Sequence, residues 1–287
     1  MNQQTLKQRC SAYLRSPLSL VLLLLVTAAA VLTVFVLVFL IAYILIKGIP
    51  YLTPELFAWN YNSENVSLMP ALINTVMMTL LSLLIAAPLG IFAAIYLVEY
   101  AKRGNKVVEL VRITAETLSG IPSIVYGLFG FLLFTVSLKW SYSILGGALT
   151  LAIMILPLIM RTTEEALKSV PDSYREGSFG LGAGRLRTVF RIVLPSAVPG
   201  ILAGVILGIG RIVGETAALM YTAGTVAGIP TTLMGSGRTL AVHMYVLTNE
   251  GLYTNQAYAT AVVLLLIVVA INALSGFIAK RIGKGKN

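Results

Sequence analysis

Six long apolar runs constrain the fold of this chain more than any other feature of its sequence. They cover residues 19–46, 71–98, 122–138, 144–160, 198–221 and 257–279. A helix needs roughly 20 apolar residues to cross a hydrocarbon core, and most of these runs reach that length. Only 11% of the 287 residues are charged and 57% are hydrophobic, which is unlike a soluble domain. We therefore predict an all-α membrane protein with six transmembrane helices.

Basic residues are distributed unevenly among the segments between these runs. One side would carry Lys7, Arg9, Arg15, Lys102, Arg103, Lys106, Arg112, Arg161, Lys168, Arg175, Arg185, Arg187, Arg191, Lys280, Arg281, Lys284 and Lys286. The other side would carry Lys47, Lys139 and Arg238. By the positive-inside rule, this predicts a multi-pass protein with both termini in the cytoplasm. The net charge of +10 is then explained by orientation, and we expect no nucleic-acid partner.

The chain has one cysteine and one histidine. Cys10 falls in the predicted cytoplasmic tail, so no intrachain disulfide is expected. We expect His243 to be an ordinary residue of an outer loop and no metal site to form from His and Cys. A membrane phosphatase or a lipid-modifying enzyme would need a cluster of His, Asp or Ser at one interface, and a single outer histidine argues against both.

The stretch "SGIPS", residues 119–123, interrupts the approach to the third run. Charged and apolar residues mix upstream of it, and one helix from there to residue 138 would be too long for an upright span. We therefore expect an interfacial or bent segment that is broken near 119–123. Ser119, Ser123 and the N–H groups of a helix start suit an anion. A helix kink whose hydroxyls satisfy freed carbonyls is the interpretation we favour.

The longest cytoplasmic loop, 161–200, predicts two short helices below the membrane. Pro171 and Asp172 are expected to open the first helix, with Asp172 as its cap, and "GLGAG" at 180–184 is expected to close it with positive-φ residues. An apolar stripe among arginines then predicts the second helix.

Within this loop, Glu176, Gly182, Ile192, Leu194 and Pro195 fit the pattern E-A-A, three residues, G, nine residues, I-x-L-P. The pattern resembles the coupling loop of bacterial ABC importer permeases. The two alanines are replaced by glycine and serine, which lowers local helix propensity. The resemblance implies a type-1 permease core whose coupling helix docks on a cytoplasmic ATPase. The chain has no G-x-x-x-x-G-K-[ST] motif, so ATP and Mg are expected on that partner, and this chain is expected to be non-catalytic and free of cofactors.

Further stretches narrow the resemblance to the PstA family of phosphate-transport permeases. They are "IYLVEYAKRGNKVVELVRI", "GIPSIVYGLFG", "LPLIMRTTEEALKSVPDS", "GRIVGETAALMYTAG" and "VHMYVLTNEG". The family implies a second permease, PstC, a dimer of the ATPase PstB and an extracytoplasmic phosphate-binding protein, PstS. It also implies a bacterial inner-membrane location. We divide the chain into a tail, first span and outer loop at 1–70, the permease domain at 71–280 and a basic tail at 281–287.

Two charges in the fifth run are the main candidates for contact with phosphate. On a continuous helix, Arg211 and Glu215 would extend the stripe of Gly200, Gly204 and Gly208, which lets another helix approach closely. A charge in the membrane costs at least about 2.5–3.5 kcal/mol and persists mainly when it is paired or functional. One interpretation is a buried ion pair that fixes packing. The other is that Arg211 binds phosphate oxygens while Glu215 holds its guanidinium in place.

Arg161, at the cytoplasmic end of the fourth run, is a second substrate candidate, although an orientation-setting arginine is the ordinary expectation there. Other functions stay open at this stage. A secondary transporter would need coupling-ion carboxylates within its spans, and Glu215 is the only clear one. A permease for sulfate, molybdate or an amino acid differs only in its substrate.

Overall fold

The computed structural model describes residues 17–102 and 104–284, and all the regular elements in these ranges are helices. Cys10, most of the predicted N-terminal tail and residues 285–287 lie outside them. Five helices of the described part are long and apolar enough to cross a membrane, and a bent helix pair brings the total to six. The predicted all-α membrane fold is confirmed.

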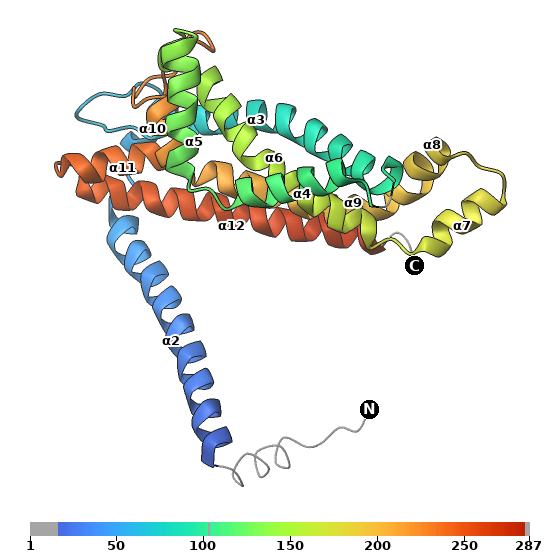
Figure 1. Cartoon of the computed structure of the whole chain (residues 1–287). Coiled ribbons are helices and arrows are strands. Elements are labelled where there is room, and N and C mark those ends of the chain that lie inside the picture. Colours follow the sequence, from blue (N-terminus) through green and yellow to red (C-terminus); the bar gives the residue numbers. More distant parts are fainter. Residues whose placement is uncertain (1–16, 103, 285–287) are drawn as a thin grey trace.

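Four long helices run lengthwise beside one another and form the body of the molecule (Figure 1). They are α3 (Met69–Ile95), α6 (Ile144–Lys168), α9 (Leu194–Val213) and α12 (Thr254–Lys284). α6 packs against both α3 and α9, and α9 also packs against α12. α6 is therefore the central helix, and two thirds of its most apolar window is buried (67%).

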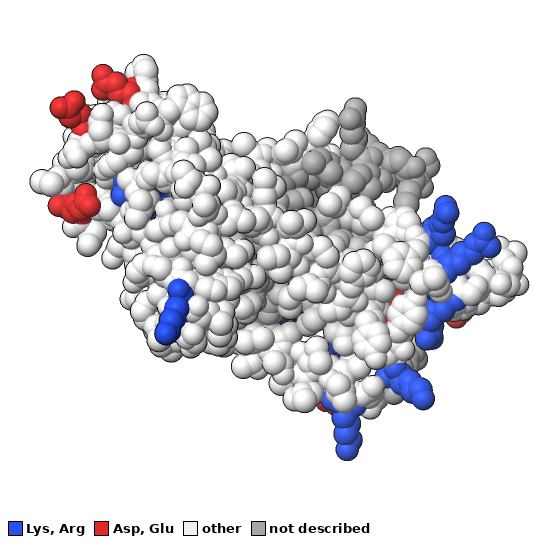
Figure 2. All heavy atoms as spheres, turned by 90° about the horizontal axis from the view of Figure 1, so that it is seen from above, with Lys and Arg blue, Asp and Glu red and all other residues white. Residues whose placement is uncertain are grey.

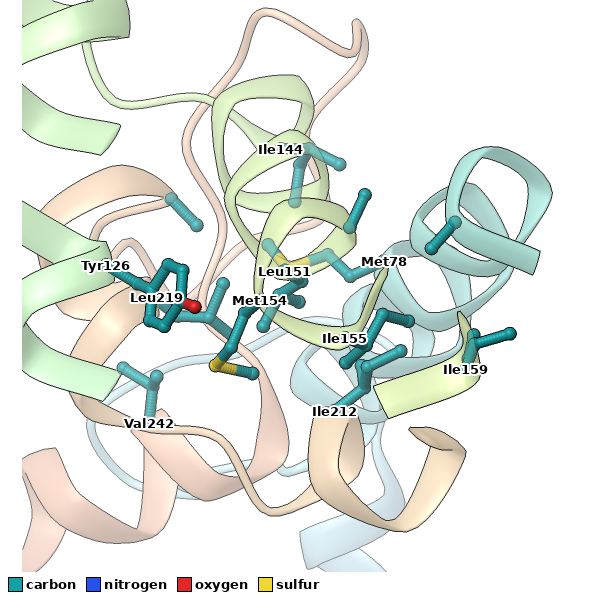
Figure 3. Packing of buried hydrophobic residues seen from close by; sticks show 13 residues of the cluster. Met78, Tyr126, Ile144, Leu151, Met154, Ile155, Ile159, Ile212, Leu219 and Val242 are labelled. Atoms are coloured by element: carbon teal, nitrogen blue, oxygen red, sulfur yellow. The ribbon is translucent and has the colours of Figure 1, made fainter. Parts of the chain in front are cut away.

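The main core surrounds α6 and contains large aliphatic side chains from several helices (Figure 3). Met154, Ile155 and Ile159 of α6 are fully buried beside Ile212 of α9. Polar groups at these contacts are hydrogen-bonded, as hydrocarbon requires. For example, the Ser82 hydroxyl of α3 donates to the Ala148 carbonyl of α6 at 3.1 Å.

The third predicted span is a bent pair of helices. α4 (Lys106–Ser119) lies along the body, and α5 (Ser123–Gly130) continues as a π-helical segment, η4 (Phe131–Ser137). The two parts meet at an angle of 102°, and α5 stands across the long helices (Figure 1). The predicted break at 119–123 is confirmed, because Pro122 has an extended ψ of 141° and cannot continue α4.

The fifth predicted span is also broken, which the sequence pattern did not predict. α9 ends at Val213, and a separate short helix, α10 (Ala217–Thr222), follows. Gly214 is the C-cap of α9, and Thr216 has a non-helical φ of −123°. The expectation of one helix from 198 to 221 is therefore wrong.

The first span, α2 (Pro17–Gly48), leaves the body at an angle and has no buried residue in its most apolar window (Figure 1). Its C-terminal end contacts α12, where the Tyr43 and Tyr258 hydroxyls lie 3.4 Å apart. This agrees with the expectation that the first span is peripheral to the core.

Basic side chains are concentrated toward one end of the body. α7 (Asp172–Gly180) and α8 (Arg185–Thr188) lie at one end, and α11 (Leu240–Glu250) lies at the other. On the face shown in Figure 2, Lys and Arg side chains gather at the end that holds α7 and α8, and a few acidic side chains lie at the opposite end. We call these the α7 end and the α11 end.

The predicted small-residue stripe of α9 faces α6. A Cβ atom at Gly200 would lie 2.7 Å from the Ala166 Cβ, and one at Gly204 would overlap the Thr162 side chain. Gly208 is less crowded, with Ile159 atoms 3.8 Å away. The close approach of the two helices therefore depends most on Gly200 and Gly204.

We predict opposite effects for two alanine substitutions in α9. Gly204→Ala should lower the unfolding temperature, since overpacking costs about 1–3 kcal/mol. Gly210→Ala is the matched control, because no atom lies within 4 Å of its added Cβ and alanine favours a helix by about 0.5–1 kcal/mol. Thermal unfolding of the purified chain in detergent measures both. Equal effects would contradict the packing described for Gly204.

Candidate translocation and coupling sites

Arg211 is a half-buried residue in the last turn of α9, directly before the helix break. At a rise of 1.5 Å per residue it lies roughly 25 Å along the helix from Leu194. Directly after this break, α10 packs against α5, where a Cβ atom at Gly127 would lie 2.8 Å from the Ala218 Cα. Tyr126 of α5 and Ile212, the residue after Arg211, both belong to the main core (Figure 3). Arg211 therefore adjoins the junction of α5, α9 and α10.

The predicted ion pair between Arg211 and Glu215 does not form. Glu215 follows the end of α9, and its buried carboxylate accepts a hydrogen bond from the Ala218 backbone N–H at 3.0 Å. The helix break explains the difference, because Arg211 and Glu215 no longer share one helical face. Among the described residues, Arg211 has neither a salt bridge nor a hydrogen bond, so its guanidinium is available to another anion.

Arg161 has protein partners. Its Nε atom lies 3.2 Å from Glu165 Oε1, and its Nη1 atom lies 3.7 Å from Glu116 Oε1 of α4. These groups border a hollow of about 180 Å³ between α4 and α6, near the α7 end. The same hollow contains Glu164, which lies 2.7 Å from Arg112 and 2.6 Å from Lys168. Its basic and acidic groups are therefore largely matched, and Arg161 is the weaker substrate candidate.

Ser119 and Ser123 occupy the two sides of the bend between α4 and α5. The Ser119 hydroxyl donates to the Glu116 carbonyl at 2.8 Å and so helps to terminate α4. Ser123 is the first residue of α5. The Ser119 contact supports the helix-kink interpretation that we favoured, and a role for either serine in binding substrate stays a prediction.

The two helices predicted in the loop 161–200 form at the α7 end, with two changes in detail, and we call α7, the turn at 181–184 and α8 with its continuation to residue 195 the elbow. Pro171 occupies the N-cap of α7, and Asp172 is its first residue and accepts from Arg175 at 3.2 Å. The expectation that Asp172 caps the helix is wrong, because proline already sets an extended start. The second helix also continues from α8 through the π-helical segment η5 (Val189–Val193) into α9. The elbow is thus joined directly to a membrane span.

The five residues predicted to couple the permease to an ATPase lie along this elbow. Glu176 is exposed on α7, and Gly182 adopts a positive φ of 80° in the turn, where a side chain would be strained. Ile192, Leu194 and Pro195 fall where η5 meets α9. Gly182 and Ile192 both line a second hollow, of about 290 Å³, between the arms of the elbow. A hydrogen bond of 2.8 Å between the Ser178 and Thr188 hydroxyls holds the two arms together.

Arg175 is an important residue of this region that the sequence motif did not identify. Its guanidinium pairs with Glu99 of η3 (Tyr96–Tyr100), the π-helical end of α3, at 2.7 Å. It also donates to the Leu167 and Val170 carbonyls, at 2.9 and 2.8 Å. Because the Glu99 and Arg175 side chains are only 8% and 15% exposed, this contact is a buried one. Arg175 therefore fixes α7 to the ends of both α3 and α6. The only sequence signal for this role of Arg175 was its position next to Glu176.

The comparisons with known proteins agree with this architecture. Over 87% of this chain and 90% of the relative, it is 34% identical to the probable ABC transporter permease protein YqgI of Bacillus subtilis. It is 36% identical to the phosphate transport system permease protein PstA 1 of Mycobacterium tuberculosis, over 74% of this chain and 71% of that protein. PstA of Pasteurella multocida is 41% identical over 62% of this chain and 63% of that protein.

Two solved transporters share the fold. A bacterial importer of the acidic polysaccharide alginate matches with a TM-score of 0.66 at 17% identity, over 90% of this chain and 95% of that chain. The MetNI methionine ABC transporter matches with a TM-score of 0.59 at 20% identity, over 75% and 94%. Residues 86–285 also match the family of binding-protein-dependent transport system inner membrane components. The chain belongs to this family of ABC importer permeases.

Proposed function

We propose that this chain is a transmembrane permease subunit of an ATP-driven phosphate importer and forms half of the phosphate pathway. The observation that carries the proposal is the unpaired, half-buried Arg211 at the broken α9–α10 junction. The identity of the substrate is suggested by relatives that are named as phosphate permeases and are 34–41% identical to this chain. In this proposal, phosphate passes between two related permeases by alternating access, and PstC is the second permease.

The chemistry of Arg211 suits phosphate. A guanidinium group offers several N–H donors in a planar fork that matches the oxygens of a phosphate anion. An unpaired charge in hydrocarbon would cost at least about 2.5–3.5 kcal/mol, so a water-filled pathway or a passing anion is the favoured setting for it. Glu215 has a different role from the one predicted, because it accepts the Ala218 N–H at the start of α10 and leaves Arg211 free.

The elbow supplies the proposed connection to ATP hydrolysis. Its exposed surface includes Tyr174, Phe179 and Leu181, and Leu181 is 91% exposed. Apolar side chains of this kind are expected to be covered by a partner. We assign that partner as the PstB dimer, which would hold ATP and Mg, and we assign substrate delivery to PstS. The permease itself would perform no covalent chemistry.

The distribution of charge supports an orientation. Since basic side chains gather at the α7 end, we infer that this end and both termini are cytoplasmic. The α11 end would then face the binding protein. A permease for another small oxyanion or solute is the second candidate, because the name of YqgI specifies no substrate and the structural neighbours import methionine or alginate.

Arg211→Gln should reduce phosphate uptake by at least about 10- to 100-fold, since a hydrogen bond to a charged group is worth about 1.5–3 kcal/mol. Uptake into cells or proteoliposomes measures the effect, and co-purification of the partner subunits checks that assembly survives. Lys139→Gln, an exposed basic residue outside the described pockets, is the control. Normal uptake by the Arg211 variant would refute its assigned role.

Glu176→Lys should uncouple the ATPase from the permease, because it reverses a charge on the proposed docking face of α7. Hydrolysis would then no longer rise when phosphate-loaded binding protein is added. Glu109→Lys is a matched control, since this glutamate is also exposed but lies on α4, outside both the elbow and the α11 end. If ATP hydrolysis in the Glu176 variant still rose as in the wild type when phosphate-loaded binding protein was added, the coupling assignment would be wrong.

Arg175→Ala should destabilise the attachment of the elbow, because it leaves the Glu99 carboxylate buried without its partner. Breaking a buried ion pair costs about 3–5 kcal/mol. Thermal unfolding measures the loss, and Lys106→Ala, an exposed residue near the same end, is the control. In the double variant with Glu99→Gln, the two losses should be clearly less than additive. Additive losses would contradict a direct interaction.

A further inference from the structure

A second cluster of polar side chains lies at the α11 end, apart from the proposed pathway and coupling sites. It consists of Arg238 and His243 with Tyr61 against them, and Asn74 and Thr239 complete its polar wall. Arg238 is 4% exposed and His243 is fully buried. The expectation that His243 is an ordinary loop residue is therefore wrong, because it lies on the buried face of α11.

Arg238 carries a buried charge without a carboxylate partner. No salt bridge to it occurs within residues 17–102 and 104–284, and its Nε and Nη2 atoms are buried without hydrogen-bond partners. Its guanidinium carbon lies 4.8 Å from the centre of the Tyr61 ring. This cation–π contact offsets only part of the cost of removing a guanidinium from water. The site therefore has a surplus of positive charge.

His243 lies against the same tyrosine ring as Arg238. Its ring meets the Tyr61 ring edge to face at 6.2 Å between centroids, and neither ring nitrogen makes a hydrogen bond of normal geometry. Burial and, to a smaller extent, the Arg238 charge together lower its pKa to about 3, against an opposing effect of the Val66 backbone. The imidazole is thus neutral at physiological pH and offers one N–H donor.

The surroundings hold these groups in place. The Asn74 amide donates to the Gly228 and Arg238 carbonyls at 3.0 and 3.1 Å, and the Thr75 hydroxyl accepts from the Leu240 N–H at 2.8 Å. The Thr239 hydroxyl, at the N-cap of α11, does not cap the helix and is itself unpartnered. The positive end of the α11 dipole adds to the potential there.

We propose that Arg238, His243 and the Thr239 hydroxyl form a binding site for a small inorganic anion. An anion neutralises the guanidinium and accepts hydrogen bonds from Arg238, His243 and Thr239 together. Water can satisfy individual donors, and it can also serve the unpartnered Asn74 Oδ1, but it does not neutralise the charge. The inference does not depend on the transported substrate, since it concerns a closed site at the opposite end of the body from the elbow.

Thermal unfolding of the full-length chain in detergent tests the site. Sodium gluconate is replaced by chloride, bromide or phosphate at constant ionic strength. We expect at least one of these small anions to raise the unfolding temperature by about 2–4 °C. A response to halides identifies a monatomic site, and a response to phosphate alone identifies an oxyanion site. The absence of any response would overturn the proposal in favour of bound water.

Arg238→Met locates the effect. This variant should lose the anion response while remaining at least as stable as the wild type in gluconate, because methionine replaces an uncompensated buried charge. Lys47→Gln, an exposed basic residue outside this cluster, should keep the response. A response that persists in Arg238→Met would place the anion elsewhere. If that variant fails to fold, anomalous diffraction from bromide in the wild-type protein decides the matter, since an empty site beside Arg238 and His243 would contradict the proposal.

Discussion

Backbone polar groups within a hydrocarbon environment must find partners inside the protein, and this requirement shapes the helix breaks and helix ends of this chain. A helix break in this setting is costly unless side chains compensate for it. In the α9–α10 break, the Glu215 carboxylate accepts the Ala218 N–H, and α10 packs against α5 and α6. These contacts stabilise the break in the fifth span, and they leave the Glu215 carboxylate bound to a backbone N–H and not to Arg211. Within the described part of the chain, Arg211 therefore stays without a carboxylate, as its proposed role with an anionic substrate requires.

The same principle links the elbow to the membrane helices. The carbonyls at a helix end need partners from outside the helix, and Arg175 donates to the Leu167 carbonyl in the last turn of α6 and to the Val170 carbonyl just beyond it, while it pairs with Glu99. One side chain thus joins α7 to the ends of two membrane helices. Movement of α7 by a docked partner would be transmitted to α3 and α6 through this contact, and to α9 through the continuous backbone of α8 and η5.

Much of this architecture could be predicted from the sequence. The long apolar runs identify the membrane helices, and Gly200 and Gly204 identify the face of α9 that meets α6. Pro122 marks the bend before α5, and Gly182 marks the turn of the elbow. In each case a local property, such as hydropathy, a missing side chain or a missing N–H, decides the structure.

The remaining features depend on tertiary contacts that no local pattern contains. The continuous apolar character of 198–221 hides the break after Val213, because Gly214 alone is a weak signal in a membrane helix. The charges at Arg211 and Glu215 then fit a helical pair that the structure does not form. Likewise, the burial of His243 beside Arg238 follows from the packing of α11 against the segment before α3, far away in the sequence.

The most direct measurement of the central claim uses the permease reconstituted in proteoliposomes with its ATPase and binding protein. ATP hydrolysis and solute uptake are recorded with phosphate and with sulfate as the only added oxyanion. If this chain belongs to a phosphate importer, phosphate should stimulate both ATP hydrolysis and uptake, and sulfate should stimulate neither. Stimulation by sulfate without a response to phosphate would contradict the assignment of this chain to phosphate import.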